Sequence, residues 1–466
     1  MLYGRQMAVH HGCVSRGQTG VNNRFCHCRS PRESPWRSAQ GNHLPQMHLL
    51  IAFHDHRMHK HETQAMPACL GENPDVRPSR LPDAPTAGST GHSRDTASAG
   101  GRQRSGWLIM ERTFAFVGCR TTRARNAEGT GISVFEIDPS GGWQHCQTLE
   151  PLVNPSFLAL SEAQDRLYAV HGDESEVSAY RFDSVSGLLS ALNVRSGVGR
   201  NPVHVEFSRD GSSLVIAGYA TGSLTPVPIA SDGSLNSPSL PVVLEGRPGP
   251  HRVEQVSSHP HHVPRYSTRF VDSDWYIVPD KGLDTVFAVR WLSDGSSVVK
   301  CARAREGAGP RHAAFHPLRP YVYVVNELDS TLTSWLFNHS TGDLTAVNTV
   351  SVIPGDYHGW SRAAGIAIAA DGRSLYVTNR GHDTIATFCL DPITCLPTDI
   401  AWTPTGGSFP RFLCLGPDGK TLYVANENSH SIVQFLLESG SGRPVATGRR
   451  VETGSPVCIV FARFGT

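Results

Sequence analysis

The stretch GPRHAAFHPLRPYVYVVNELDSTLTSW, residues 309–335, contains the pattern that decides the fold. An alternating apolar segment follows Pro310, a second ends at Asn326, and a third begins at Thr331 after a polar turn. Alternation with a period of two predicts short strands, and polar turns between them predict antiparallel hairpins. The same order recurs in residues 364–388 and 409–435, so the unit is a repeat.

The repeat extends through the chain after Met110. Its starting positions are Pro155, Pro202, Pro260, Pro310, Ala363, Pro410 and Pro456, at intervals of 47, 58, 50, 53, 47 and 46 residues. A period of about 40–50 residues with three or four short strands per unit is the signature of a β-propeller. Residues 110–466 number 357, or 51 for each of seven units. We therefore predict an all-β, seven-bladed β-propeller over 110–466.

The last unit is incomplete, because one strand-like segment, 457–461, remains after Pro456. Residues 113–117 and 131–135, at the beginning of the repeat region, have the same alternating character. We predict that strands from both ends share the seventh blade. Such closure of the ring removes an exposed sheet edge.

Residues 1–109 differ in composition from the remainder. They contain 13 Lys and Arg against 7 Asp and Glu, and 10 of the 23 His, without a periodic apolar pattern. Such a segment buries too little apolar surface to offset its ordering entropy, so we predict a disordered leader. The repeat begins directly after Met110. We expect Met110 to be the natural start and the leader to lie outside the functional protein.

The global composition excludes several classes of partner. The chain has 42 Lys and Arg against 41 Asp and Glu, a net charge of +1. This gives no overall field that would attract nucleic acid or an anionic membrane. No apolar run approaches the roughly 18–20 residues of a membrane-spanning helix. Seven cysteines follow Met110, an odd number without a CxxC pair, which favours reduced thiols. We expect a cytoplasmic monomer without nucleic-acid or membrane partners.

The polar residues fall at two recurring positions of the repeat. Consecutive antiparallel strands place the start of the first and the end of the second at one face. The first position holds His261, Arg311 and Arg411, and the second holds Lys281, Glu327, Arg380 and Glu427. Repeat symmetry directs them to one mouth of the central channel, within one sector, since the equivalent residues elsewhere are Val203, Gly218 and Val457.

Cations that converge with a carboxylate and an imidazole can bind an anion beside an acid/base group. Structural ion pairs between blades would use the same residues, so the pattern leaves both interpretations open. The sequence around His259, His261 and His262 lacks further ligands at defined spacing. We therefore expect no metal ion there.

Several segments resemble the seven-bladed propeller lactonase family. They are GAGPRH (307–312), FHP (315–317), VNEL (325–328), NRGHD (379–383), HPHHV (259–263) and VPDKG (278–282). The resemblance covers about residues 113–464. That family includes the propeller-type 6-phosphogluconolactonases and the fungal 3-carboxy-cis,cis-muconate cyclase.

The resemblance implies roles for particular residues. The expected catalytic residues are His261, Arg311, Glu327 and Arg380, and the expected substrate-binding residues are Lys281, His259 and His262. Arg311 and Arg380 would hold the anionic group and polarise the lactone carbonyl, while Glu327 or His261 would be the general base. Neither a metal nor a cofactor is implied.

The expected function is hydrolysis of a small anionic sugar lactone, similar to that of 6-phosphogluconolactonase. Lactonising cycloisomerisation of a carboxymuconate and a non-enzymatic binding scaffold remain as alternatives. One departure bears on turnover. The family usually has an acidic residue after two alanines, and this chain has Gly365 after Ala363 and Ala364.

Overall fold

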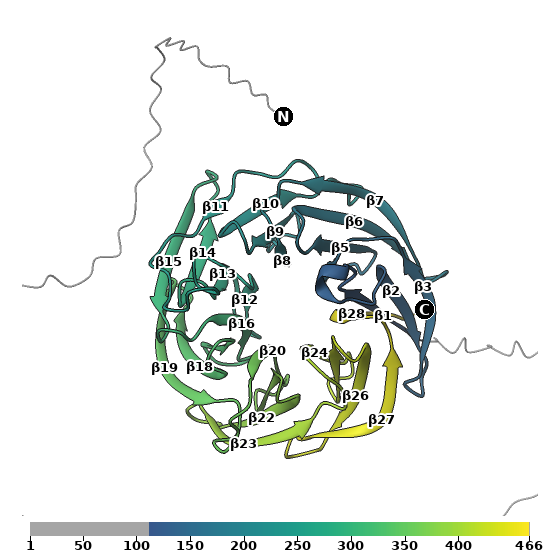
Figure 1. Ribbon diagram of the computed structural model, residues 1–466. Coiled ribbons are helices and arrows are strands. Elements are labelled where there is room, and N and C mark those ends of the chain that lie inside the picture. Colours follow the sequence, from purple (N-terminus) through teal and green to yellow (C-terminus); the bar gives the residue numbers. More distant parts are fainter. Residues whose placement is uncertain (1–110, 466) are drawn as a thin grey trace, which may run out of the picture. The chain divides into compact units, whose positions relative to one another are not determined.

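The computed structural model describes residues 111–465, which form seven four-stranded antiparallel sheets arranged in a ring (Figure 1). The predicted all-β, seven-bladed propeller is thereby confirmed. Within these residues the one helical element is a single 3-10 turn, η1 (Arg123–Arg125). The described residues contain no helix that is long and apolar enough to cross a membrane. The predicted leader, 1–109, lies outside the described residues.

Each blade is one sheet, whose four strands follow one another from the channel outward. The first three blades are β4 (Pro155–Leu160), β5 (Arg166–His171), β6 (Glu176–Asp183), β7 (Leu188–Ser196); β8 (Pro202–Phe207), β9 (Ser213–Gly218), β10 (Ser223–Pro228), β11 (Val242–Val243); and β12 (Arg265–Ser267), β13 (Asp272–Asp280), β14 (Thr285–Trp291), β15 (Ser297–Arg303).

The remaining four blades complete the ring. They are β16 (Pro310–Phe315), β17 (Tyr321–Asn326), β18 (Thr331–Asn338), β19 (Asp343–Ser351); β20 (Arg362–Ile368), β21 (Ser374–Arg380), β22 (Thr384–Leu390), β23 (Pro397–Pro404); β24 (Pro410–Leu415), β25 (Thr421–Asn426), β26 (Ser431–Leu437), β27 (Pro444–Glu452); and β28 (Pro456–Phe464), β1 (Arg112–Cys119), β2 (Ile132–Ile137), β3 (Trp143–Leu149).

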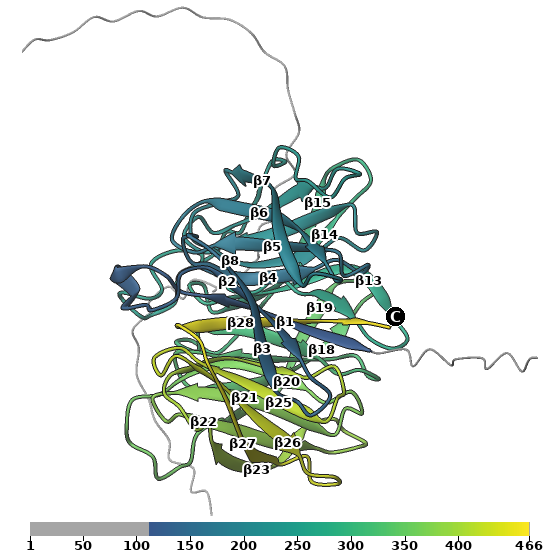
Figure 2. The same cartoon turned by 90° about the vertical axis from the view of Figure 1, so that its right-hand side faces the viewer.

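The seventh blade contains strands from both ends of the described chain. β28 pairs antiparallel with β1 from Arg112 opposite Phe464 to Cys119 opposite Pro456. The side view shows the two strands next to each other (Figure 2). The predicted closure is confirmed: β1 pairs with β28 on one side and with β2 on the other, so the beginning of the repeat region is not a free sheet edge.

The hydrophobic core lies between neighbouring blades. Phe114 and Phe116 of β1 meet Phe182 of β6 edge-to-face, with ring centroids 5.0 and 4.7 Å apart. All three rings are buried. Each buried aromatic side chain stabilises the fold by about 1.5–3 kcal/mol, so such contacts around the ring fix the blades relative to one another. The channel mouth is therefore lined by residues on a rigid frame.

Candidate active site

Bulges in the inner strands direct side chains toward the mouth of the channel. In β4, β8, β16 and β24 the pairing register jumps from the first proline to the residue two positions later. The residues left out of the ladder are Ser156, Val203, Arg311 and Arg411. A bulge bends its strand and re-aims the unpaired residue. The two arginines thus leave the sheet and turn to the mouth.

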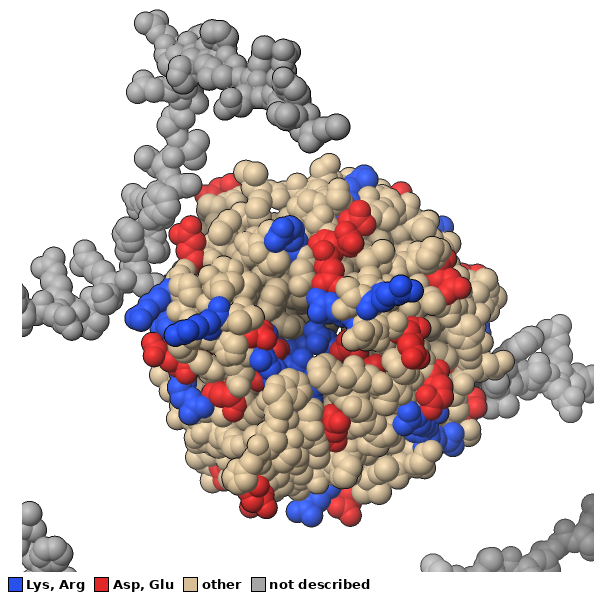
Figure 3. Space-filling view, viewed as in Figure 1, with Lys and Arg blue, Asp and Glu red and all other residues tan. Residues whose placement is uncertain are grey.

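A cavity of about 510 Å³ opens at this mouth. The predicted residues that line it are His261, Lys281, Glu327, Arg380, Arg411 and Glu427. Arg311 lies directly beneath, in an adjoining pocket of about 20 Å³ that also contacts His261 and Arg411. The space-filling view shows Lys and Arg side chains gathered around this central hollow, with carboxylates among them (Figure 3). The repeat positions singled out in the sequence therefore converge in space.

Glu327 is the electrostatic centre of one side of the cavity. It follows the last residue of β17 and is 4% exposed. Its Oε1 lies 2.8 Å from Lys281 Nζ and 3.5 Å from Arg362 Nη1, and its Oε2 lies 3.1 Å from Arg380 Nη2. Arg311 Nε is 3.0 Å from Oε2, an ionic contact whose N–H direction does not fit a hydrogen bond.

Three of these cations decide the protonation of Glu327. Burial alone would raise the pKa of the carboxyl, but the charges of Arg380, Lys281 and Arg311 outweigh it and hold the pKa well below its ordinary value. The carboxylate is ionised at neutral pH, and both oxygens are engaged. Glu327 is consequently better suited to holding the cations in place than to accepting a proton.

Backbone carbonyls of β20 orient the two arginines. Arg311 Nη1 donates to the Ala364 carbonyl at 2.6 Å, and Arg380 Nη2 donates to the Ala363 carbonyl at 3.1 Å. The neighbouring Gly365 leaves little room, since a Cβ there would lie 3.0 Å from two atoms of Leu413. The surroundings of Gly365 therefore leave little space for an acidic side chain. The backbone carbonyls of Ala363 and Ala364 fix the two guanidinium planes instead.

His261 brings an imidazole to the floor of the cavity. It is 6% exposed, and its ring meets those of Tyr219 and His312 edge-on at 5.5 and 5.3 Å. Burial, and secondarily the Arg311 charge, lower the pKa of His261 well below its ordinary value. Its Nδ1 has no hydrogen-bond partner within residues 111–465. At neutral pH this is a neutral imidazole with a free nitrogen.

The structure places His259 and His262 away from the cavity. His259 stacks on the Tyr219 ring at 4.5 Å, and its Nδ1 lies 3.0 Å from the Tyr219 carbonyl oxygen. His262 lies further down the channel, where it stacks on His312 at 4.3 Å. Neither side chain lines the cavity. Their predicted part in substrate binding stays a prediction. In the structure His259 packs against Tyr219, which lines the cavity, and His262 packs against His312, which lines the small pocket beneath it.

Sequence reasoning missed several charged residues of the site. Glu254 lies in the excursion after β11, outside the repeat, and contacts Lys281 Nζ at 2.7 Å and Arg362 Nη1 at 3.1 Å. Arg120 follows the end of β1, the position that Glu327 has in its own blade. That blade is divided between the two ends of the chain, so the equivalence is hidden in the sequence. The expectation that charge gathers in one sector is therefore wrong, because Arg120 lines the opposite side.

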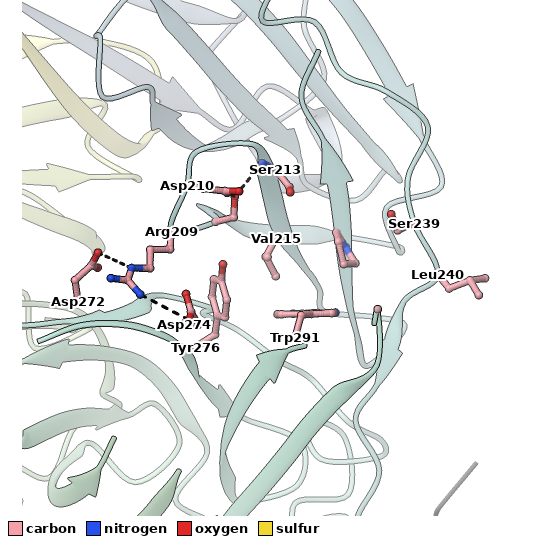
Figure 4. A pocket seen from close by; sticks show the side chains of 13 residues that line it. Arg209, Asp210, Ser213, Val215, Ser239, Leu240, Asp272, Asp274, Tyr276 and Trp291 are labelled. Carbon is pink, nitrogen blue, oxygen red and sulfur yellow. Dashed lines mark hydrogen bonds and ion pairs between the residues drawn. The ribbon is translucent and has the colours of Figure 1, made fainter. Parts of the chain in front are cut away.

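A larger cavity, of about 770 Å³, is lined by the β8–β9 hairpin and by residues of β13 and β14 (Figure 4). Because β8 begins at the mouth and runs away from it, this hairpin lies at the opposite face. Arg209 there pairs with Asp272 at 3.0 Å and with Asp274 at 3.9 Å, and Trp291 forms part of the wall. Among the residues that the structure describes, its lining contains no histidine and no cluster of cations. Arg209, the one cation among its described lining residues, is already paired with two carboxylates, whereas the mouth gathers several cations, so the mouth cavity is the candidate active site.

Comparison with known proteins agrees with this geometry. Residues 114–461 match the family model described as lactonase, 7-bladed beta-propeller. The chain is 30% identical over 356 residues to the 6-phosphogluconolactonase of Bacillus subtilis, covering 76% of this chain and 99% of that one. It is also 30% identical over 319 residues to the 6-phosphogluconolactonase of Formosa agariphila, covering 65% and 86%.

A solved structure shows the same architecture. The periplasmic gluconolactonase of Pseudomonas aeruginosa is 27% identical and superposes with a TM-score of 0.68, covering 75% of this chain and 99% of that one. The family match spans most of the chain, and the named proteins are covered over 86–99% of their own length. This chain belongs to the lactonase family of seven-bladed β-propellers.

Proposed function

We propose that this protein hydrolyses a small anionic sugar lactone, in the manner of a 6-phosphogluconolactonase. One observation is decisive for the proposal: a neutral His261 with a free nitrogen lies beside Arg311 at the floor of a cationic cavity. Hydrolysis of an anionic lactone needs a proton acceptor for water and positive charge for the substrate. The names of the Bacillus and Formosa relatives support this substrate class.

In the proposed mechanism, Arg311 and Arg380 polarise the lactone carbonyl. Their guanidinium groups are fixed by Ala364, Ala363 and Glu327, so they need no reorientation when negative charge develops on the carbonyl oxygen. Preorganised donors of this kind stabilise the transition state in a site that excludes water.

His261 is the better base of the two residues that the sequence left open. Both oxygens of Glu327 are occupied by four cations, whereas Nδ1 of His261 has no hydrogen-bond partner among the described residues. The neutral imidazole can take the proton of an attacking water and later return it to the ring oxygen that leaves. The adjoining pocket of about 20 Å³, between His261 and Arg311, has room for about one water.

A panel of purified substrates tests the proposal. We expect turnover of 6-phosphoglucono-δ-lactone, followed by acid release, and slower turnover of glucono-δ-lactone. A 3-carboxymuconate should remain unchanged, as read from its ultraviolet absorbance. Turnover of the muconate alone would establish the cycloisomerase instead. Failure with every compound, by protein shown to be folded, would leave a binding scaffold.

The same assay with exhaustive EDTA treatment tests our proposal that no metal takes part. Around the mouth, seven cationic side chains among the described residues face four carboxylates, a net charge of +3. Such a cavity repels a divalent cation, so activity should survive the chelator. Activity that disappears and returns with zinc or calcium would contradict this. We also propose a cytosolic location, on the odd number of cysteines after Met110 without a CxxC pair.

A further inference from the structure

The side of the cavity opposite Glu327 is built around Arg120. This side chain is 3% exposed, and its Nη1 is buried without a hydrogen-bond partner in the described part of the chain. Burial, and secondarily the charge of Arg411, lower the pKa of Arg120 to about 9. The guanidinium is therefore still charged at neutral pH. Burying this charge without a full set of partners lowers the stability of the folded protein.

Charge on this side is not balanced. Arg411 Nε lies 3.8 Å from Glu427 Oε2, an ion pair without a hydrogen bond, and that Oε2 has no hydrogen-bond partner within residues 111–465. Arg125, also on the cavity wall, is paired with Asp173 by two hydrogen bonds. Arg120 and Arg411 thus share a single carboxylate. An anion placed between them would supply the missing charge.

The local packing holds Arg120 in this position. Gly172 follows β5 at the place where Lys281, Glu327 and Arg380 stand in other blades, and a Cβ there would lie 2.3 Å from Arg120 Nη1 and 2.9 Å from Ser156 Oγ. The glycine therefore makes room for the arginine of the neighbouring blade. Ser156 Oγ is buried as well and, among the described residues, has no partner. Both residues line the small pocket beneath the cavity, and Arg120, like Arg411, also lines the cavity itself, which has room for an anionic group.

We propose that Arg120 and Arg411 bind a second anionic group of the substrate from the wall of the 510 Å³ cavity opposite Glu327, and so distinguish phosphorylated from unphosphorylated sugar lactones. This inference rests on the proposed function, because it assigns the carbonyl to Arg311 and Arg380 across the cavity. A phosphate accepts hydrogen bonds from several guanidinium N–H groups at once, and Arg is suited to this geometry.

Kinetics of the Arg120→Met variant test the proposal. Methionine keeps much of the volume and removes the charge. We expect kcat/KM for 6-phosphoglucono-δ-lactone to fall about 10- to 100-fold, mainly through KM, as for the loss of a charged hydrogen bond. Turnover of glucono-δ-lactone should change less than about twofold, since no anion of that substrate reaches this side. Arg209→Met, which removes a charge at the opposite face, should alter neither rate.

A second variant separates the position of Arg120 from its charge. Gly172→Ala keeps every charge but pushes Nη1 aside, so it should reproduce the selective loss for the phosphorylated lactone. Equal losses for both lactones in Arg120→Met, or a loss confined to kcat, would overturn the inference while leaving the lactonase proposal intact.

Inorganic phosphate provides a readout that does not depend on turnover. Titration calorimetry should show phosphate binding to the wild-type protein, weakened at least about tenfold in Arg120→Met. If neither lactone is hydrolysed, the proposed function fails, and this titration still decides whether the anion site exists. Absence of phosphate binding by the wild-type protein would overturn the site.

Discussion

Arg311→Met is expected to lower kcat/KM for the hydrolysed lactone by about a hundred- to a thousand-fold, the usual loss when one preorganised donor is removed. The variant should nevertheless be as stable as the wild-type protein. Burial and the charges of Arg380 and Arg411 lower the pKa of Arg311, which means that the fold disfavours its charged form. The buried charge of Arg311 lowers the stability of the fold, so we expect this residue to serve the reaction and not the stability of the protein.

Glu327→Gln should behave differently. Glutamine preserves the shape of the side chain but leaves Lys281, Arg311, Arg362 and Arg380 without their shared carboxylate. Breaking a buried ionic cluster in this way typically costs about 3–5 kcal/mol of stability. We therefore expect a lower melting temperature together with a large loss of rate, since the arginines are no longer held in place.

Rate per folded molecule and melting temperature together distinguish the two roles. Glu254→Gln is the matched control, because Glu254 also contacts Lys281 and Arg362 but is more exposed than Glu327. This substitution should therefore lower the melting temperature and the rate less than Glu327→Gln does. If Arg311→Met lowers the melting temperature strongly while its rate per folded molecule stays near that of the wild type, the cluster is a structural ion-pair network. The catalytic role of Arg311 would then be wrong.

The architecture was predictable because its signals are local and repeated. Each Asp-Gly turn requires a positive φ, as at Gly211 (φ +70°) and Gly419 (φ +63°), and so marks a hairpin in the sequence. The spacing of the seven repeat starts, from Pro155 to Pro456, gives the number of blades. The incomplete final repeat then requires a partner at the other end of the ring, and the pairing of β28 with β1 provides it.

The site was predictable only where it follows the repeat. Lys281, Glu327 and Arg380 stand at one repeat position, so strand direction alone brings them to the mouth. Glu254 lies on a long excursion whose course no periodicity specifies. Neighbouring residues can also separate: His261 lines the cavity, whereas His262 lies further down the channel on His312. Which of the two faces the substrate depends on the local backbone.

The buried histidines along the channel lead to a prediction about acid stability. His204, His262 and His312 come from three consecutive blades, with His204 and His262 rings 4.0 Å apart and His262 stacked on His312 at 4.3 Å. His261 adjoins them. Burial lowers the pKa of His204 to about 3, and burial, with neighbouring charges, lowers the pKa of the other three well below the ordinary value.

Lowering the pH from 7.5 to 5.5 is expected to destabilise the propeller by about 5 kcal/mol. The unfolded chain protonates these four imidazoles near pH 6.5, whereas the folded protein keeps them neutral. Their contribution to stability is therefore complete above about pH 6.5 and is lost as the pH falls below it, by about 1.4 kcal/mol per histidine and pH unit. This is a large share of the stability of a typical protein.

Melting temperatures and urea unfolding midpoints between pH 7.5 and 5.5 measure this effect. His312→Phe keeps a ring against His262 but removes one proton-binding site, so it should lessen the pH dependence by about a quarter. His339→Asn, an exposed change in the β18–β19 turn, should leave the dependence unaltered. Wild-type stability that stays constant over this range would contradict the prediction. It would mean that the channel accepts protons while folded, and the neutral state required of His261 as a base would then be lost at mildly acidic pH, together with activity.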